Sequence, residues 1–428
     1  MTEPTHPVRS VDVAVLGGGV VGLGIAWAVA QTGRSVAIID AAPATGATEA
    51  AAGMLAPVSE LHYQEEHLLQ LMLASASLYP AFIESLGASL RDTGYQRTRT
   101  INVGADAADR RALADLREVQ LSHGLAVDAL TIREARELEP MLSPQLSSAS
   151  SISRDHQVDP RRLSARLIGA LTTKAQAWEA GLDPFIRQNA STLLHRDPTD
   201  NSSRVVGVVL ADGSIVEAPE VIVATGLAAA ELGGLPDDLR LPLRPVFGDI
   251  IRLRVPESLR PLVTATIRGV VRGVPVYLVP REDGTIVIGA TAREDASAGI
   301  SAGGIHQLLR DAQVLVPAVA ELEIIEVMAR ARPGTPDNAP LLGRVRSSVG
   351  SAASAITDDM ASESDARIPG LIIATGFFRH GVLLMPAAAQ ICAGLLDGVE
   401  DPRWAAFAPD RFSPLTPSPQ PSLKAAAL

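Results

Sequence analysis

The chain opens with two mostly apolar stretches that are separated by a glycine-rich segment. Val11–Leu16 and Ser35–Ile39 have the length and continuity typical of strands that are buried on both faces of a parallel sheet. Between them, Val20–Thr32 has the composition of an apolar helix that ends near Gly33. The pattern therefore predicts a βαβ unit of about thirty residues.

Helical spacing and helix-start signals recur along the rest of the chain. The spacing of apolar residues predicts helices over 67–86, 107–122, 305–315 and 385–397. Thr131 with Glu134 has the pattern of a capping box. Asp159 and Pro160 have the pattern of an N-cap and first-turn proline for a helix that runs through Leu171.

Strand patterns dominate from residue 204 onward. Runs of strand length there cover 205–210, 215–217, 221–226 and 371–376, and one earlier run covers 99–104. Residues 241–292 have the pattern of antiparallel strands, and Asp212-Gly213 and Asp283-Gly284 are hairpin turn signals. The stretches "VIVATG" and "LIIATG" both end at a glycine, so we expect them to join the opening strands in one sheet. The fold class is therefore α/β with α+β elements.

Composition indicates a globular protein of a reducing compartment. Of the 428 residues, 47% are hydrophobic and 20% are charged, which is the balance of a folded chain. The 37 Lys and Arg and 48 Asp and Glu give a net charge of −11, which argues against nucleic acid or an anionic membrane as a partner. Cys392 is the single cysteine, so no internal disulfide can form, and we expect a cytoplasmic protein.

The apolar run Val13–Ala30 reaches the length, about 18 residues, at which a membrane span is considered. A signal peptide is a second interpretation, because Arg9 precedes the run. The run nevertheless contains five glycines, clustered where a strand would turn into a helix. A buried strand–turn–helix explains it better, and we expect no membrane span.

The glycines of this turn have the spacing of a dinucleotide-binding motif. Gly17 allows a tight turn, Gly19 allows close approach of a pyrophosphate, and Gly22 allows close packing of helix and strand. Asp40 follows the second strand, where a carboxylate accepts hydrogen bonds from ribose hydroxyls and disfavours a 2′-phosphate. The alternative is a turn that only packs a helix on a sheet, with Asp40 as a solvated strand end.

The motif alone does not separate FAD from NAD, but the rest of the chain favours FAD. The segment Ala47–Pro57 is rich in small residues, which allows its backbone to lie against a flavin ring or its phosphates. A sheet assembled from the beginning, middle and end of the chain is typical of large flavoproteins.

Five motifs together carry a family resemblance. "VAVLGGGVVGLGIA", "TEAAAGML", "VYLVPREDGTIVIGAT", "RPGTPDNAPLLGR" and "ATGFFRHGVLLMPAAA" occur in this order from residue 11 to about 398. In this combination the chain resembles the D-amino-acid oxidase family of flavoenzymes, in particular its glycine oxidase branch of thiamine biosynthesis. Residues 60–150 and 345–368 carry little of the resemblance.

The resemblance implies a Rossmann-like FAD-binding domain with an interleaved antiparallel-sheet domain for the substrate. We expect residues 1–60, 151–240 and 325–408 to form the FAD-binding domain. Residues 61–150 and 241–324 are expected to form the substrate domain, 345–368 a mobile surface loop and 409–428 a disordered tail.

The family pattern also assigns site residues. Arg332 matches the arginine that binds the substrate carboxylate, Tyr277 a tyrosine that helps to hold it, and Arg379 a second arginine near the flavin. Met54 is also expected at the substrate. Taken singly, these arginines could be surface ion pairs and Tyr277 a core residue. The expected FAD contacts are Gly17, Gly19, Val20, Val21, Gly22, Asp40, Thr48, Ala52, Gly53, Met54, Gly376, Phe377, Phe378, Arg379, His380, Gly381, Val382 and Leu383.

The activity that the resemblance implies is oxidative deamination of glycine or another small amino acid or amine. Hydride transfer to flavin N5 gives an imino acid, which hydrolyses to a keto acid and ammonia, and oxygen reoxidises the flavin to hydrogen peroxide. No residue is assigned as a catalytic acid or base. The helix near Gly381 is expected to point its N-terminus at the flavin. Non-covalent FAD is expected, because attachment as in the related sarcosine oxidases needs a cysteine in a different motif from that of Cys392.

Two rival functions stay open at this point. One is a D-amino-acid or sarcosine-type enzyme with another electron acceptor, and the other is a flavin-binding protein without turnover. His62 and His67 do not have metal-site spacing, so no metal is expected. Glu49 is a charge within the small-residue segment that the sequence does not explain. Family members are often tetramers, and we expect a homo-oligomer.

Overall fold

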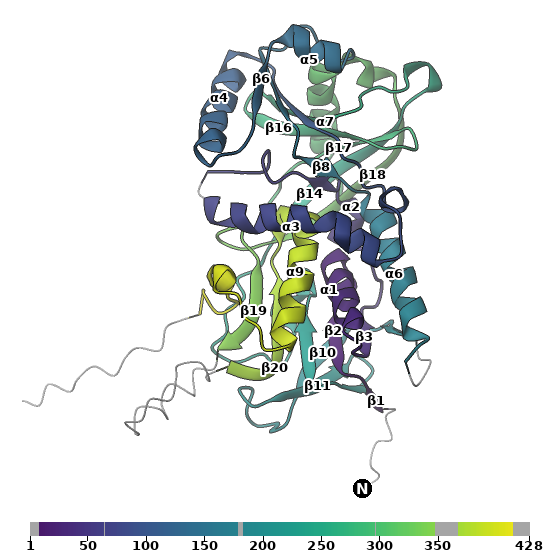
Figure 1. The fold of residues 1–428 in the computed structure, drawn as a ribbon, viewed down its shortest axis with the longest axis vertical. Coiled ribbons are helices and arrows are strands. Elements are labelled where there is room, and N and C mark those ends of the chain that lie inside the picture. Colours follow the sequence, from purple (N-terminus) through teal and green to yellow (C-terminus); the bar gives the residue numbers. More distant parts are fainter. Residues whose placement is uncertain (1–7, 64, 179–182, 296, 347–366, 414–428) are drawn as a thin grey trace, which may run out of the picture.

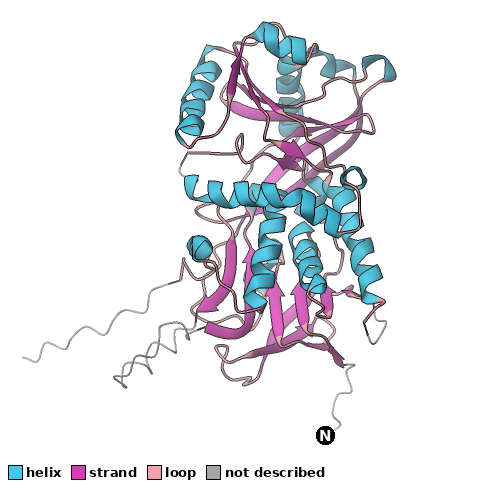
Figure 2. Ribbon diagram, in the orientation of Figure 1, coloured by secondary structure: helices cyan, strands magenta, loops and turns pink. Residues whose placement is uncertain are grey.

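The computed structural model describes residues 8–63, 65–178, 183–295, 297–346 and 367–413 as an α/β fold with several sheets (Figures 1 and 2). Its helices are α1 Val20–Gln31, α2 Ala47–Ala50, α3 Glu66–Ser85, α4 Ala107–Ser122, α5 Ile132–Leu138, α6 Pro160–Ala175, α7 Ala302–Leu315 and α9 Gly381–Leu396. Short 3-10 turns include η2 Gly226–Glu231, η7 Phe378–His380 and η8 Pro402–Phe407.

The strands fall into four sheets. The first half of the chain contributes β1 Val8–Ser10, β2 Val13–Leu16, β3 Val36–Ile39, β4 Met54–Leu55, β5 Thr100–Gly104, β6 Asp128–Leu130, β7 Ser148–Ile152, β8 His156–Gln157, β9 Phe185–Ile186, β10 Ala190–His195 and β11 Val205–Leu210. The second half contributes β12 Ile215–Glu217, β13 Glu220–Val223, β14 Arg244–Arg254, β15 Thr266–Val271, β16 Val274–Pro280, β17 Thr285–Gly289, β18 Glu323–Gly334, β19 Leu341–Arg346 and β20 Arg367–Thr375.

The first large sheet is the parallel core that the opening pattern predicts. It has the order β19-β20-β13-β2-β3-β9, and only the β19–β20 pair is antiparallel. Strands β2, β13 and β20 come from the beginning, middle and end of the chain, so the expectation for "VIVATG" and "LIIATG" is confirmed. Because both faces of this sheet are covered, its strands β2 and β3 are apolar and buried throughout rather than alternating.

Helices cover one face of this sheet and a small sheet covers the other. Residues of α1, α3, α6 and α9 form one apolar core with the face of β2 that carries Val13 and Val15. The opposite face packs on the sheet β1-β12-β11-β10. By length and composition, the helical stretch Phe378–Leu396 could cross a membrane, but 61% of it is buried inside the protein, where α9 contacts α1 and α3.

The second large sheet has the order β18-β14-β17-β16-β15-β5-β7-β6 and is antiparallel except for the β15–β5 pair. Helix α7 packs on it and closes a separate apolar core. Figure 1 shows this sheet with α4, α5 and α7 in the upper half of the molecule, the parallel sheet in the lower half, and α3 lying across between them. The expected pairing of a Rossmann-like unit with a mostly antiparallel sheet is confirmed.

Several expected boundaries need correction. Helix α9 begins at Gly381 and not at Met385, because Pro386 is accommodated inside the helix. The expected domain boundary after residue 324 falls within β18, which pairs with β14 from Glu323 to Gly334. Short strands β7 to β10 were not predicted.

The two segments expected to be irregular lie mostly outside the described residues. These are the loop at 345–368, of which 347–366 are not described, and the tail at 409–428, of which 414–428 are not described. The start of the expected tail is ordered: Arg411 forms an ion pair with Asp337 at 2.9 Å, and Phe412 packs against the core beside the small sheet.

Candidate active site

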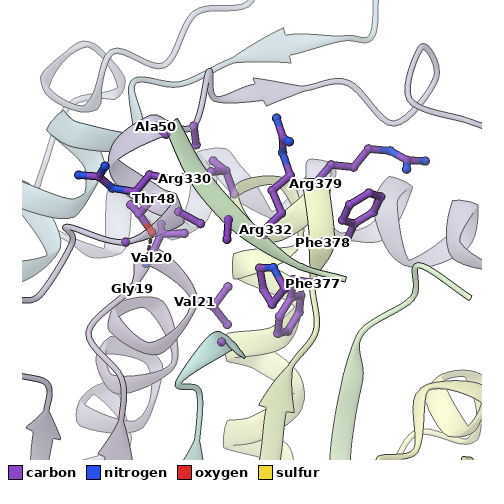
Figure 3. Close-up of a pocket in the computed structure, with 18 of the residues that line it drawn as sticks. Gly19, Val20, Val21, Thr48, Ala50, Arg330, Arg332, Phe377, Phe378 and Arg379 are labelled. Atoms are coloured by element: carbon purple, nitrogen blue, oxygen red, sulfur yellow. Dashed lines mark hydrogen bonds between the residues drawn. The ribbon is translucent and has the colours of Figure 1, made fainter. Parts of the chain in front are cut away.

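A cavity of about 680 Å³ extends from the turn after β2 to the second large sheet. It is lined by every sequence-predicted site residue except Gly22, namely Gly17, Gly19, Val20, Val21, Asp40, Thr48, Ala52, Gly53, Met54, Tyr277, Arg332, Gly376, Phe377, Phe378, Arg379, His380, Gly381, Val382 and Leu383. Figure 3 shows part of this lining, with Val20 and Thr48 at one side and Arg332, Phe378 and Arg379 at the other. Residues from distant segments therefore meet in one space.

The glycine turn has the geometry that its motif predicts. Gly17 has φ of +101°, a conformation that other residues rarely adopt. A side chain at Gly22 would run into the carbonyl oxygen of Gly17, so Gly22 serves close packing and does not line the cavity. The backbone N–H of Gly18 donates to Asp40 Oδ2 at 2.6 Å, which joins the turn to the end of β3. Each carboxylate oxygen has a further lone pair for a ligand hydroxyl.

The N-terminus of α1 opens onto the cavity. Its N-cap is Gly19, which offers no side-chain acceptor, and Thr48 Oγ1 instead accepts the Val20 N–H at 3.0 Å (Figure 3). The N–H groups of Val21 and Gly22 belong to the first turn and have no acceptor within the helix. With the helix dipole, they favour a phosphate at this point.

Glu49, which the sequence left unexplained, fastens the small-residue segment to the second sheet. Its carboxylate receives Arg330 Nη2 at 2.7 Å, and Arg330 Nε also donates to the Thr45 carbonyl at 3.1 Å. The Glu49 carbonyl accepts from Arg161 Nε at 3.1 Å and from Arg252 Nη2 at 3.2 Å. Three guanidinium groups thus hold the segment in place along the cavity wall.

Arg332 is a partly buried cation of the cavity lining, without a carboxylate partner among the described residues. No Asp or Glu of the described chain lies within ion-pair distance of its guanidinium, which donates to the Thr291 carbonyl at 3.3 Å and lies against the backbone of Gly248. Burial lowers the pKa of Arg332, and the neighbouring Tyr277 opposes that shift. Burial likewise raises the pKa of Tyr277, whose hydroxyl is therefore protonated at neutral pH. Asp249 also acts on Arg332, but from beyond ion-pair distance. A partly buried guanidinium without an ion-pair partner, beside a phenol, is suited to binding a carboxylate.

Arg379 lies in η7, directly before α9, and forms ion pairs with carboxylates. It forms ion pairs with Glu65 and, from Nε at 3.4 Å, with Glu60. Its guanidinium carbon lies 5.1 Å from the ring centre of Phe378, which has a φ of +47° (Figure 3). Burial lowers the pKa of Arg379, against the raising effect of Glu65. Because its charge is compensated, Arg379 is a weaker carboxylate site than Arg332.

Three charged residues that line the cavity were not predicted from the sequence: Glu60, Arg268 and Arg330, which was described above with Glu49. Glu60 and Arg268 both line the cavity and form an ion pair with each other. Burial lowers the pKa of Arg268 to about 10, so it stays charged at neutral pH. The available signal was weak: Arg268 is a single charge within the otherwise apolar strand "TIRGVV", directly across from Tyr277 in the sheet.

The lining fits a non-covalent FAD. The cavity has an anion site at the α1 N-terminus, Asp40 for a ribose, and a wall of small residues from 50 to 53. The Nε2 atom of buried His380 has no hydrogen-bond partner within the described chain, and His380 lines the cavity. Burial keeps the pKa of His380 well below its usual range, so the ring is neutral. Cys392 is buried within α9 and is not part of the lining, which agrees with non-covalent binding.

The fold and the cavity define the class of protein as a dinucleotide-binding oxidoreductase, and comparisons with known proteins give the family. The family described as FAD dependent oxidoreductase (DAO) matches residues 12–395. Glycine oxidase of Geobacillus kaustophilus is 30% identical over 394 residues, which cover 91% of this chain and 93% of that protein. Its crystal structure superposes with a TM-score of 0.77 at 28% identity, covering 94% of this chain and 99% of that one.

A bifunctional relative is also similar over most of this chain. The bifunctional protein ThiO/ThiG of Trichormus variabilis is 29% identical over 413 residues, which cover 94% of this chain. The chain spans only 55% of the length of that protein. The chain belongs to the DAO family of FAD-dependent oxidoreductases, and its cofactor is FAD.

Proposed function

We propose that the protein is an FAD-dependent oxidase of glycine or another small amino acid or amine. The observation that carries the proposal is Arg332, a partly buried guanidinium without an ion-pair partner among the described residues, in the cavity that also holds the dinucleotide-binding turn. Removing a cation from water without an ion-pair partner is costly for the folded protein, and a substrate carboxylate would offset that cost. The relatives named glycine oxidase support the same conclusion.

The chain's own residues would bind and orient the substrate. Arg332 would grip the carboxylate with two N–H groups, and the Tyr277 hydroxyl would donate a further hydrogen bond to it. Met54, Tyr277 and Phe378 would exclude water from the substrate end of the cavity. Holding the substrate in one orientation supplies much of the rate enhancement. FAD, when bound, would supply the redox chemistry, as the hydride acceptor for the substrate carbon and the electron donor to oxygen.

The products would be an imino acid, hydrolysed to a keto acid and ammonia, together with hydrogen peroxide. The names of the ThiO/ThiG relatives support a role in supplying thiamine thiazole synthesis. Within the molecule, we propose that the parallel sheet with its helices forms the FAD-binding domain and that the second large sheet, now including β18, forms the substrate domain.

A substrate panel on the purified holoprotein tests the proposed function. Glycine, sarcosine, D-alanine and D-proline are added in turn, and oxygen uptake and peroxide are recorded. Oxygen consumption with peroxide formation is expected for at least one of them. Dye reduction without oxygen uptake would instead favour a dehydrogenase that uses another electron acceptor.

A further inference from the structure

Glu60 joins two arginines at the substrate end of the cavity. Its Oε1 faces Arg268 Nη1, and its Oε2 lies 3.4 Å from Arg379 Nε. The Glu60 side chain is 8% exposed and that of Arg268 is 17% exposed, and both line the cavity. The pair is therefore part of the wall that a substrate would meet, and its charges are little screened by water.

Two further contacts fix Glu60 in this position. The preceding residues Val58 and Ser59 donate their backbone N–H groups to the buried carboxylate of Asp155, at 3.1 and 3.0 Å. On the other side, Glu65 holds both Arg379 and, at 2.8 Å, the side chain of Asn338. The segment that carries Glu60 is thus anchored at both ends.

The charges at this end of the cavity nearly balance. Arg268 and Arg379 form ion pairs with Glu60 and Glu65, whereas Arg332 forms no ion pair with a described residue. Arg268 and Arg332 lie on either side of Tyr277: Arg268 is its register partner in the neighbouring strand, and the Tyr277 hydroxyl contacts Arg332. Without Glu60, Arg268 would offer a second carboxylate a guanidinium in the same cavity as Arg332.

We propose that Glu60 determines specificity by occupying Arg268, so that the site accepts amines with one carboxylate and rejects those with two. The inference rests on the proposed function, because it takes Arg332 as the site of the first carboxylate. A second carboxylate would meet the Glu60 charge at close range, and like charges in a dry cavity repel strongly. Specificity here comes from a repulsive element as well as from the attractive one at Arg332.

The test compares binding of mono- and dicarboxylates to the holoprotein. Acetate, malonate, succinate and glutarate are titrated at pH 8, and the dissociation constants are read from the perturbed flavin absorption spectrum. The three dicarboxylates cover a range of distances between their carboxylates. The variants are Glu60→Gln, Arg268→Met and the double variant. Glu84→Gln, at an exposed position on α3, is a control that makes the same change in net charge.

The two single variants should shift the preference in opposite directions. In Glu60→Gln, at least one dicarboxylate should gain roughly tenfold or more over acetate, because Arg268 becomes free to bind it. In Arg268→Met, the affinity for dicarboxylates relative to acetate should fall by a similar factor. The reason is that Glu60 then keeps only Arg379, at 3.4 Å, as a partner for its negative charge. The double variant and Glu84→Gln should keep the ratio of the unmodified protein. For turnover, Glu60→Gln should raise the kcat/KM of iminodiacetate relative to that of glycine.

Each result decides between the alternatives. An unchanged ratio in both single variants, with FAD bound and acetate binding intact, overturns the specificity role of Glu60. A gain in Glu60→Gln that persists in the double variant overturns the assignment of the second carboxylate to Arg268. If acetate fails to bind the unmodified holoprotein, the carboxylate site itself is wrong, and the proposed function fails with it.

Discussion

At the scale of single residues, the proposed substrate binding depends on the charged side chains of the cavity and on which of them form ion pairs. Arg332, Arg268 and Arg379 approach the same cavity, and only Arg332 lacks a carboxylate within the described chain. Full burial of an unpaired cation costs several kcal/mol, and for the partly exposed Arg332 this is an upper bound on what a bound carboxylate can return. We therefore assign Arg332 to binding of the substrate carboxylate, and Arg268 and Arg379 to the wall of the cavity.

Replacing Arg332 tests its role directly. Arg332→Ala should keep FAD bound but lower kcat/KM by roughly thirtyfold or more, about 2 kcal/mol, mainly through a higher KM. Arg332→Lys should recover only part of the loss, because an ammonium group cannot form the two parallel hydrogen bonds of a guanidinium. Steady-state kinetics and the flavin absorbance of each variant check this. Unchanged kinetics in Arg332→Ala would falsify the carboxylate role.

Asp155 is a second buried charge, and it makes stability depend on pH. Burial raises its pKa from 3.8 to about 6, although hydrogen bonds from Ser59 and Val58 oppose the shift. Since the folded protein holds this proton more tightly than the unfolded chain, the contribution of Asp155 to stability falls as pH rises from about 4 to about 6. The size of this change is about 3 kcal/mol, from the width of the shift.

The matching variant is Asp155→Asn, which cannot titrate. The melting temperature of the unmodified protein minus that of the variant should decrease between pH 4 and pH 6.5, because only the unmodified protein must ionise a buried carboxyl. Melting curves recorded across this range give the difference directly. A difference that stays constant or rises with pH contradicts the assignment.

At the scale of elements, the turn from β2 into α1 is the part that sequence reasoning predicted best. Its glycine spacing is local, and each glycine has a separate steric reason that the structure bears out at Gly17 and Gly22. Gly22→Ala should push α1 away from the turn and weaken FAD binding by at least about tenfold, measured by titrating the apoprotein with FAD.

A matched glycine serves as the control for that change. Gly169 lies inside α6, has open space where a side chain would be added and has no left-handed backbone. Gly169→Ala should leave FAD affinity unchanged and stabilise the protein by up to about 1 kcal/mol through helix propensity. Equal effects of the two substitutions on FAD binding would show that close packing at Gly22 is not what positions the cofactor.

The sequence pattern predicted that α9 begins at Met385, but it begins at Gly381. Pro386 can lie inside the helix because another helix supplies the hydrogen bonds that the proline disrupts. Pro386 has no N–H, so the carbonyl of Val382 loses its helical partner, and the Tyr79 hydroxyl of α3 donates to it instead. Ser75 Oγ similarly donates to the Leu383 carbonyl at 2.7 Å and accepts from the Ala387 N–H at 3.1 Å. These hydrogen bonds come from α3, which is distant in the sequence, so the local sequence of α9 does not predict them.

Removing the Tyr79 hydroxyl should expose this dependence. Tyr79→Phe leaves the Val382 carbonyl buried without a donor and should cost about 1–3 kcal/mol of stability. Because Val382 and Leu383 line the cavity, FAD affinity should fall as well. Denaturant unfolding of the holoprotein checks the first effect and FAD titration the second. A fully stable variant with normal FAD affinity would show that α9 does not need this hydrogen bond.

At the scale of the whole molecule, the two large sheets meet at the cavity, and distant segments supply its two ends. Motif residues predicted the cofactor end and the Arg332–Tyr277 pair, because each lies in a distinctive local pattern. Glu60 and Arg268 were not predictable in the same way. Each one alone is most simply interpreted as a charged surface residue, and only the fold brings the two together as an ion pair. The edge strand β18 crossed the predicted boundary because it is bonded along its length to β14.

Anaerobic reduction of the purified holoprotein tests whether the cavity oxidises an amino acid that Arg332 binds. Glycine, sarcosine and D-alanine are added in the absence of oxygen while the flavin absorption band is followed. At least one of them should bleach the band in the unmodified protein, and Arg332→Ala should need a far higher concentration for the same effect. A flavin that none of these amino acids reduces, in a protein that binds FAD normally, would contradict the proposed function.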